Sequence, residues 1–313
     1  MIGAALIDVL NGRRARGSRA PHGDGSRVAL AVEGGAMRGV VSAGMVSALE
    51  ALGYGDAFDA AFGSSAGAIN AAYFLAGQAR LGTTIYSEDI NNRRFIAPWR
   101  PLVGRPIVNL EFLIGVARHG KPLDTARVRA SAAPLTVLAT DVATASRAAL
   151  RDFPTDESLL LAMRAGATMP VVAGGPFEYG RRRYLDASLT EPIPVQIAES
   201  EGFTHVLALL TRPAGAPQRV SALDTWYVIP GLRRMSPALA RMYSDRTGPY
   251  AALQDCLAAG RGPEGRADVL GIWPAGPEVS KLERDPGRLR DGARQGFDAV
   301  CRVFGQPPAV AQR

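Results

Sequence analysis

The feature that most constrains the fold of this 313-residue chain is the placement of two glycine-rich turns between short apolar runs and helical segments. RVALAV (27–32) is β-like in composition, and EGGAMRG (33–39) follows it directly. A helical segment comes next and ends near Gly53. FDAAFG (58–63) predicts a second strand and AGAINAAYFLAG (66–77) a second helix. This alternation predicts a parallel sheet with helices on both faces.

The same alternation recurs downstream and favours one α/β domain over 27–313. The pattern predicts further strands at 134–141, 182–188, 205–210 and 267–273, and further helices at 156–167, 232–259 and 285–304. Residues 78–133 are less regular, and we expect a cap or insertion there. Residues 211–313 are expected to extend the sheet. Residues 1–26 end in a Gly-, Ser- and Arg-rich stretch, which favours a flexible tail.

Composition excludes several classes of protein. Hydrophobic residues make up 47% and charged residues 21% of the chain, which is ordinary for a soluble protein. No apolar run reaches the roughly 18 to 20 residues that span a bilayer, and the first ten residues lack the basic start of a secretory signal. Two cysteines, Cys256 and Cys301, favour a reducing compartment, so we expect a cytoplasmic protein. Three scattered histidines do not suggest a metal site.

The net charge of +7 leaves two interpretations open. Scattered basic residues favour plain solubility, and a basic surface also attracts anionic lipid at the inner membrane face. Motifs of RNA-binding strands are absent, so no nucleic-acid partner is expected. Within 78–133, apolar and basic residues are candidates either for peripheral contact with an anionic membrane or for ordinary cap packing: Arg93, Arg94, Phe95, Trp99 and Arg100.

The sharpest local signal is a G-x-S-x-G pattern that starts at Gly63 and ends at Gly67, with Ser65 at its centre. A nucleophile on a tight strand-to-helix turn requires small neighbours because the backbone there is strained and crowded. The turn also places the N–H of Ala66 at a helix N-terminus, where the helix dipole favours negative charge. The pattern alone is weak, but a predicted strand before it and a predicted helix after it favour a nucleophile elbow.

The second signal is the glycine turn that runs from Gly34 to Gly39. Backbone N–H groups in such a turn bind a phosphate or a tetrahedral oxyanion. The dinucleotide pattern G-x-G-x-x-G fails because Ala36 occupies its second glycine position. The P-loop pattern fails because Val40 and Val41 follow Gly39. An oxyanion hole therefore fits better than a nucleotide site.

The serine requires a base, and the sequence favours a carboxylate. His205 opens an apolar strand and is followed by two more predicted elements, so we interpret it as a structural residue and not as the histidine of a triad. A poorly solvated aspartate can instead accept the serine proton. Asp186, at a strand end in YLDASLTEPIP, is the first candidate, and Asp141, in LATDVAT, is the second.

Three motifs in this order resemble the patatin-like phospholipases: EGGAMRG, GSSAG and LDAS followed by EPIPV. The resemblance runs from about Arg27 to Phe304. It implies a three-layer α/β/α sandwich and a Ser-Asp dyad that uses no histidine, metal or cofactor. Ser65 matches the nucleophile and Asp186 the base, and the residues that match the oxyanion loop are Gly34, Gly35 and Arg38. The implied activity is hydrolysis of acyl esters of phospholipids or related glycerolipids, as in lipid degradation.

Two departures from the family pattern leave alternatives open. Ala36 replaces the third glycine of the loop, and Ala187 follows Asp186 where the family has glycine. If position 36 requires a positive φ, alanine is strained there by roughly 1 kcal/mol or more. The alternatives are a soluble carboxylesterase that acts on small esters and a weakly active or inactive relative that binds lipid.

Overall fold

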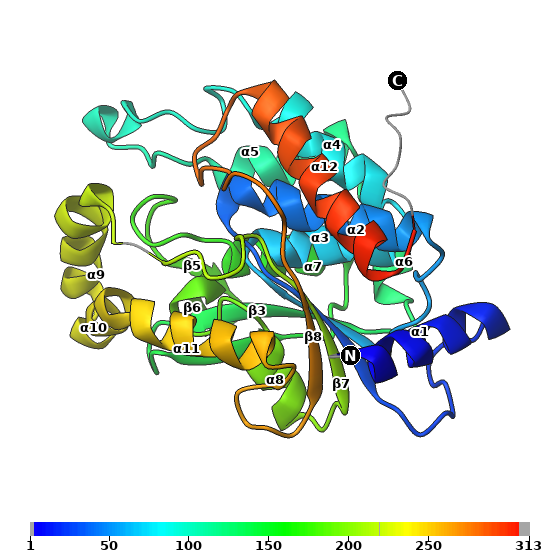
Figure 1. Ribbon diagram of the computed structural model, residues 1–313. Helices are drawn as coiled ribbons and strands as arrows, with labels where there is room; N and C mark the ends of the chain where they lie inside the picture. Colours follow the sequence, from blue (N-terminus) through cyan, green and yellow to red (C-terminus); the bar gives the residue numbers. More distant parts are fainter. Residues whose placement is uncertain (1–2, 219, 307–313) are drawn as a thin grey trace.

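Figure 1 shows a computed structural model of the protein, which describes residues 3–218 and 220–306. The remaining residues of the expected tail and domain (1–2, 219 and 307–313) lie outside the described part. One eight-stranded sheet has the order β5-β6-β3-β2-β1-β7-β8, and β4 also pairs with β3. The strands are β1 (Val28–Val32), β2 (Ala60–Ser64), β3 (Leu135–Asp141), β4 (Ser146–Leu150), β5 (Phe177–Tyr179), β6 (Arg182–Asp186), β7 (His205–Leu209) and β8 (Asp268–Ile272).

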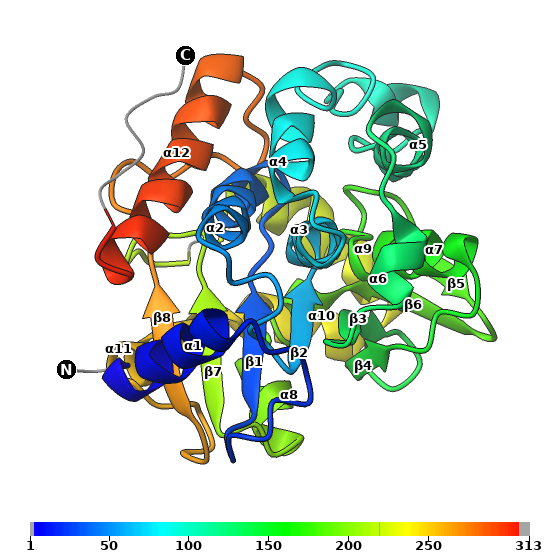
Figure 2. The same cartoon turned by 90° about the vertical axis from the view of Figure 1, so that its right-hand side faces the viewer.

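The centre of the sheet is parallel, as the sequence predicts. β3, β2, β1, β7 and β8 pair in parallel, and Figure 2 shows β8, β7, β1 and β2 side by side with their arrows in one direction. β4 and β6 pair with β3 in the antiparallel sense, and β5 pairs with β6 in the same way. The sequence pattern did not predict β4 or β5. The expected extension of the sheet after residue 211 consists of one strand in the described residues, β8, which lies beside β7.

Helices cover both faces of the sheet and form the predicted three-layer α/β/α sandwich (Figure 1). On one face α3 (Ala66–Leu75) and α7 (Asp156–Gly166) contact the strands, and α2 (Val40–Ala51) packs with α3, α4 (Ala79–Glu88) and α12 (Pro286–Val303). On the other face lie α8 (Val195–Ser200) and α11 (Thr247–Ala258). Among the described residues, no helix is both long enough and apolar enough to cross a membrane.

The central strand β1 explains why its sequence is a continuous apolar run. Val28, Leu30 and Val32 point into the larger core, which contains the side chains of α2, α3 and α12. Ala29 and Ala31 point into the smaller core beneath α8 and α11. A parallel strand that is buried on both faces has no solvent side, so it shows no alternation of apolar and polar residues.

The region from 78 to 133 is more helical than the sequence suggests. It contains α4, α5 (Leu110–Gly115), α6 (Thr125–Arg129) and a short 3₁₀ turn at Arg100–Val103. These pieces are brief and are separated by loops, which explains the weak helical pattern. Several of their apolar side chains line a cavity.

The helical stretch expected around 232–259 is present, and it is divided among three helices. They are α9 (Ile229–Met235), α10 (Pro237–Asp245) and α11. The backbone is extended at Ser236, and the Ser236 side chain accepts a hydrogen bond from the N–H of Leu239. Pro237 follows at the first helical position. Proline has no N–H to continue a preceding helix, so the break follows from the sequence once Ser236 and Pro237 are considered together.

The flexible tail expected at 1–26 is corrected by the structure, which places helix α1 at Ala4–Arg16. Leu6 and Leu10, four residues apart, lie fully buried in the larger core. The guanidinium of Arg13 is also fully buried and forms ion pairs of 2.8 Å with Asp24 and Asp59. The arginine-rich composition suggested a solvated segment, whereas one of these arginines fixes the helix to the start of the sheet.

We predict that Arg13→Ala lowers the free energy of unfolding by about 3 kcal/mol, because it leaves two carboxylates without their shared cation in a poorly solvated place. Urea denaturation monitored by circular dichroism measures this loss. Arg19→Ala is the control, since Arg19 and Asp56 form an ion pair at the exposed surface. Pairs of that kind contribute about 1 kcal/mol or less. Equal losses in both variants would contradict the anchoring role of Arg13.

Candidate active site

Ser65 occupies the sharp turn between β2 and α3. Its backbone dihedral angles are φ 55° and ψ −128°, a combination that residues other than glycine rarely adopt. Strain of this kind costs on the order of 1–3 kcal/mol and gathers at functional sites. The turn places Ser65 at the carboxyl end of a central parallel strand, which is where ligands bind in open α/β sheets.

The glycines on either side of Ser65 allow this turn because the neighbouring backbone is very close. A Cβ atom added to Gly67 would lie 2.2 Å from the carbonyl oxygen of Val32. A Cβ atom added to Gly63 would lie 2.2 Å from the Cα atom of Ala68. Both positions therefore exclude any larger residue, as the sequence pattern predicts for a nucleophile elbow.

The side chain of Asp186 meets Ser65 at this turn. The Ser65 hydroxyl donates a hydrogen bond of 2.5 Å to Oδ2 of Asp186. Asp186 ends β6, where it pairs with Ala139 of β3. The Thr140 hydroxyl donates to the carbonyl oxygen of Asp186 (2.9 Å), and the N–H of Asp186 donates to the carbonyl oxygen of Thr168 (2.8 Å). The backbone of Asp186 is thus held from two sides.

Burial raises the pKa of Asp186 above its ordinary value. Hydrogen bonds from Ser188 and Ser65, and the positive charge of Lys281, oppose this shift. The Ser188 N–H donates to Oδ1 at 2.8 Å, so both carboxylate oxygens are engaged. A buried carboxylate that is costly to ionise gains from accepting a proton. Asp186 therefore combines the position and the electrostatic environment of a base for the Ser65 hydroxyl.

The glycine-rich loop after β1 lies directly against Ser65. A Cβ atom added to Gly34 would lie only 2.7 Å from Cβ of Ser65. Ala36 has φ 54°, so the third position of the loop does require the left-handed conformation. An L-residue such as alanine is strained there by about 1–2 kcal/mol. The departure noted in the sequence thus has a conformational cost, and the loop still adopts the conformation.

Backbone N–H groups of the loop and of the elbow lack protein acceptors. Within the described part of the chain, the N–H groups of Gly35, Ala36 and Ala66 donate no backbone hydrogen bond. Ala66 is the first residue of α3, and the N-terminus of a helix favours negative charge. These three groups are therefore available to an anionic oxygen beside Ser65.

The side chain of Arg38 fixes the loop to the C-terminal part of the chain. It is 5% exposed. Its Nε donates to the Thr211 hydroxyl at 3.1 Å, and its Nη1 donates to Glu278 at 2.8 Å. Arg38 therefore anchors the loop through a salt bridge with Glu278.

A buried carboxylate next to the loop was missed by the sequence analysis. Glu33 follows β1 and accepts hydrogen bonds from the N–H of Thr211 (2.6 Å) and from the hydroxyl of Tyr250 (2.8 Å). The Thr211 hydroxyl also lies 2.9 Å from the carbonyl oxygen of Gly34. In the sequence, Thr211 is almost 180 residues from Glu33, and Tyr250 is more than 180 residues away. No local pattern marks these partners. They hold the base of the loop rigidly beside β7.

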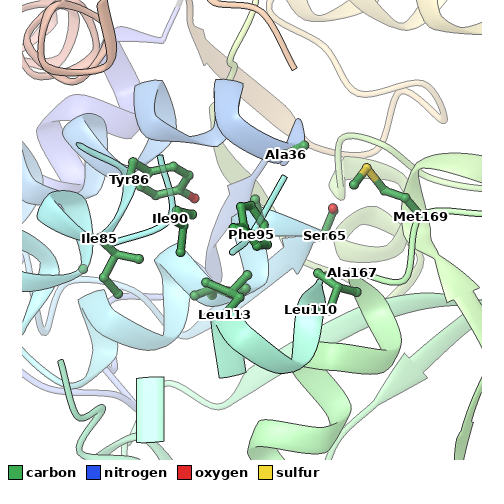
Figure 3. A pocket seen from close by; sticks show the side chains of 13 residues that line it. Ala36, Ser65, Ile85, Tyr86, Ile90, Phe95, Leu110, Leu113, Ala167 and Met169 are labelled. Atoms are coloured by element: carbon green, nitrogen blue, oxygen red, sulfur yellow. The ribbon is translucent and has the colours of Figure 1, made fainter. Parts of the chain in front are cut away.

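An apolar cavity opens beside Ser65 (Figure 3). It has a volume of about 30 Å³, which is room for about two water molecules. The cap region supplies much of its wall. The lining residues that Figure 3 labels around Ser65 are Ala36, Ile85, Tyr86, Ile90, Phe95, Leu110, Leu113, Ala167 and Met169. The site therefore joins a polar side, with Asp186 and Lys281, to a small apolar side.

The other candidate residues are not part of this site. Asp141 binds Arg182 at 2.9 Å and the N–H groups of Ala143 and Thr144, as a turn carboxylate does. His205 begins β7 opposite Val28, at the end of the sheet away from Ser65. No histidine lines the cavities at Ser65 in the described part of the chain. Nor do the described residues contain a cluster of three potential metal ligands.

Comparison with known proteins assigns the chain to a family. The profile of the family described as patatin-like phospholipase matches residues 30–199, more than half of the chain. YjjU of Escherichia coli strain K12, described as uncharacterized, is 26% identical over 257 residues, which are 80% of this chain and 69% of YjjU. VipD from Legionella pneumophila aligns with a TM-score of 0.44 and 12% identity, over 90% of this chain and 66% of VipD. This chain thus spans slightly less than two thirds of VipD.

The matched region contains the elbow, the glycine-rich loop and Asp186, whereas Thr211, Tyr250, Glu278 and Lys281 lie beyond it. The sequence resemblance is therefore confirmed: the protein belongs to the patatin-like phospholipase family.

Proposed function

We propose that this protein hydrolyses acyl esters of phospholipids or related glycerolipids through a Ser65–Asp186 dyad and an acyl-enzyme intermediate. The observation that carries the proposal is the 2.5 Å hydrogen bond from the Ser65 hydroxyl to the buried Asp186 carboxylate. Membership of a lipid acyl hydrolase family supports the reaction class. The position of Ser65 in a strained turn and the unpaired N–H groups beside it support the roles of the residues.

In the first half of the reaction, the Ser65 Oγ attacks the carbonyl carbon of the ester while its proton moves to Oδ2 of Asp186. The carbonyl oxygen gains negative charge and is stabilised by the N–H groups of Gly35, Ala36 and Ala66. When the tetrahedral intermediate collapses, the bond to the leaving oxygen breaks. The alcohol or lysolipid departs with the proton from Asp186, and the acyl group stays on Ser65.

In the second half, water takes the place of the alcohol. Asp186 accepts a proton from this water while the water oxygen attacks the acyl-enzyme carbonyl. The same N–H groups stabilise the second oxyanion. Collapse releases the fatty acid, and the proton returns from Asp186 to the Oγ of Ser65. Every proton passes through Asp186, so the proposed cycle requires no cofactor.

A specific observation also favours a second candidate function, carboxylesterase activity on small esters. The apolar cavity beside Ser65 has a volume of only about 30 Å³, whereas sites for larger ligands have about 300–1,000 Å³. A long acyl chain would require cap side chains such as Phe95 and Leu113 to separate. A short acyl group requires much less rearrangement.

The third alternative, an inactive relative, rests on Ala36 and Ala187. Two observations argue against it. The loop adopts its conformation despite the positive φ of Ala36. Ala187 is fully buried, and the Ser188 N–H after it reaches the Asp186 carboxylate. The turn at Ala187 therefore still directs Asp186 toward Ser65.

We further propose that the protein contacts anionic membrane surfaces through two exposed segments beside the site. Trp99 is 55% and Leu102 88% exposed, and Trp226, in the helical turn Asp224–Val228 that leads into α9, is 83% exposed. Figure 1 shows the 99–104 segment and α9 projecting on the same side of the molecule. Tryptophan and arginine suit an anionic interface, and Arg93 and Arg94 are exposed near Trp99. Two residues that the sequence suggested for this contact have other partners in the structure. Phe95 is buried in the apolar cavity, and Arg100 binds loop carbonyls.

The first prediction from the proposed function concerns the dyad. Ser65→Ala and Asp186→Asn should each lower acyl-ester hydrolysis by about a thousandfold or more, because residues that act as one unit are individually indispensable. His205→Ala should retain wild-type activity. The assay compares fatty-acid release from phospholipid vesicles with hydrolysis of p-nitrophenyl butyrate, and a fluorophosphonate probe reports whether Ser65 reacts.

These assays separate the candidate functions. Activity on p-nitrophenyl butyrate without release of fatty acid from vesicles would favour the small-ester carboxylesterase. If the probe labels wild type but not Ser65→Ala, the result supports Ser65 as a nucleophile even where turnover is slow. Loss of activity in His205→Ala, or full activity in Asp186→Asn, would reject the proposed dyad.

The second prediction concerns pH. Asp186 must be ionised to accept the Ser65 proton, and burial raises its pKa above the ordinary 3.8. The protonated, inactive form therefore persists to a higher pH than for a solvated aspartate. We expect kcat/KM to fall as pH decreases through this raised pKa, with a slope of one proton. Asp141→Asn should leave this acidic limb in place, and activity that persists unchanged at pH 4 would contradict the assignment.

The third prediction concerns the membrane. Trp99→Ala combined with Trp226→Ala should weaken binding to vesicles that contain phosphatidylglycerol by about tenfold or more, because two large interfacial side chains are lost. Cosedimentation with vesicles measures the change, and hydrolysis of p-nitrophenyl butyrate should stay within about twofold of wild type. Trp273→Phe serves as the control, since Trp273 packs against the smaller core. Equal vesicle binding by the double variant and wild type would refute this surface.

A further inference from the structure

A second cavity, of about 530 Å³, adjoins the polar side of the site at Ser65. Six residues line both this cavity and the polar cavity that contains Ser65 and Asp186, and these shared residues are Arg38, Met169, Ser188, Arg212, Gln218 and Lys281. The two spaces are therefore continuous along one wall. A ligand whose reacting group lies at Ser65 can extend a polar group into the second cavity.

Positive charge predominates in the second cavity. Four cations line it: Arg38, Arg212, Arg246 and Lys281. Two carboxylates face them. Glu278 lies 2.8 Å from Arg38 and 3.5 Å from Arg212, and Asp224 lies 3.0 Å from Arg246. With Lys281 included, four cations therefore face two carboxylates, and positive charge is in excess in this cavity.

Lys281 is the cation without a partner. Within the described residues, its ammonium group forms neither an ion pair nor a hydrogen bond, although it lines both cavities. The two other carboxylates nearby have partners already. Glu33 is occupied by Thr211 and Tyr250, and Asp186 accepts hydrogen bonds from Ser65 and Ser188.

The backbone places Lys281 beside the catalytic loop. Its carbonyl oxygen accepts a hydrogen bond of 3.2 Å from the N–H of Met37. Lys281 keeps exposed surface while it lines both cavities. Desolvation, followed by the charges of Arg38, Arg212 and Arg246, lowers the pKa of Lys281 to about 8. An anion in this place would relieve the repulsion among the four cations.

We propose that Lys281, together with Arg212 on the same wall, binds the phosphate group of the substrate and so selects phosphate-bearing glycerolipids over neutral esters. This inference rests on the proposed lipid acyl hydrolase function. In a phosphoglycerolipid a short glycerol bridge joins the phosphate to the acyl ester. An ester at Ser65 therefore brings its phosphate into the adjoining cavity. An ammonium group binds phosphate by charge-assisted hydrogen bonds.

The sequence makes this proposal easy to test, because the chain contains only two lysines, Lys121 and Lys281. Lys121 provides a matched control. Its ammonium group forms ion pairs with Glu88 (2.6 Å) and Asp89 (2.8 Å), and it does not line either cavity at Ser65. An amine-reactive reagent can therefore report on Lys281 with an internal reference in the same molecule.

The binding test uses the full chain with Ser65→Ala, so that no substrate is consumed. An acetylating reagent is applied at pH 8, and peptide mass spectrometry follows the modification of both lysines. We expect Lys281 to react several times faster than Lys121, because the ammonium group of Lys121 is held by Glu88 and Asp89 and that of Lys281 has no such partner. Phosphatidylglycerol vesicles should protect Lys281 by about fivefold or more, whereas diacylglycerol dispersions should not.

Inorganic phosphate separates the two sources of a phosphate group. Weaker protection by millimolar phosphate than by the vesicles supports a headgroup subsite. Protection by inorganic phosphate alone, with none by vesicles, overturns the headgroup assignment in favour of a free-ion site. Equal protection by diacylglycerol and phosphatidylglycerol, or no protection by any of them, overturns the phosphate subsite. The proposal requires that the vesicles protect Lys281 from acetylation and do not protect Lys121.

The kinetic test uses the active protein. Lys281→Gln should raise KM for phosphatidylglycerol vesicles by about tenfold and should reduce kcat/KM for p-nitrophenyl butyrate much less. Lys281→Arg should restore most of the loss, and Lys121→Gln should behave as wild type. Equal losses on both substrates would show a structural role for Lys281 and overturn the proposal. Wild type that hydrolyses neither substrate contradicts the proposed function instead, and the labelling result still decides whether phosphate binds.

Discussion

The contact between the Ser65 hydroxyl and the Asp186 carboxylate depends on nearly every other feature of the fold. The two residues are 121 positions apart in the chain. Ser65 reaches its place because β2 pairs with β1 and β3 in parallel. Asp186 reaches its place because β6 pairs with β3 in the antiparallel sense. β3 therefore joins the two halves of the site, and an error of one residue in either register would separate the two side chains.

This arrangement holds several unfavourable local states at once. Ser65 and Ala36 both have positive φ angles, and the carboxyl group of Asp186 is buried. Each of the two strained backbone conformations costs on the order of 1–3 kcal/mol, and burial of a carboxylate is also unfavourable, so the surrounding structure must offset both costs. The larger core packs beneath the elbow, and β1 approaches so closely that Gly67 has no room for a side chain. Strain is thus concentrated at the atoms that the proposed chemistry uses.

The C-terminal part of the chain does more than extend the sheet. Thr211 and Tyr250 bind Glu33 below the glycine-rich loop, and Glu278 binds Arg38 within it. The glycine-rich loop is therefore held by residues beyond the region that the family profile matches. Polar networks of this kind fix a unique geometry when every member is satisfied. The same segment supplies Lys281, for which we propose a role in phosphate binding.

Local patterns predicted much of the architecture. The alternation of strand and helix was correct from β1 to α3, and again at β3, α7, β7 and α12, because each of these elements buries an unbroken apolar run or face. Short edge strands such as β4 and β5 were missed, since their burial is partial and their side chains carry little pattern. Helix α1 was missed because Arg13 resembles a solvated residue until its buried partners, Asp24 and Asp59, are known.

The sequence by itself determined the elbow at Ser65 and the glycine-rich loop, because tight turns require small residues at fixed spacing and leave a local signature. It also indicated Asp186 as the preferred carboxylate, through its position at the end of a strand. Only the tertiary structure decided that Asp186 rather than Asp141 meets Ser65, and that Thr211 and Lys281 stand beside the loop. Contacts between distant segments depend on how strands pair and helices pack, and no local spacing encodes them.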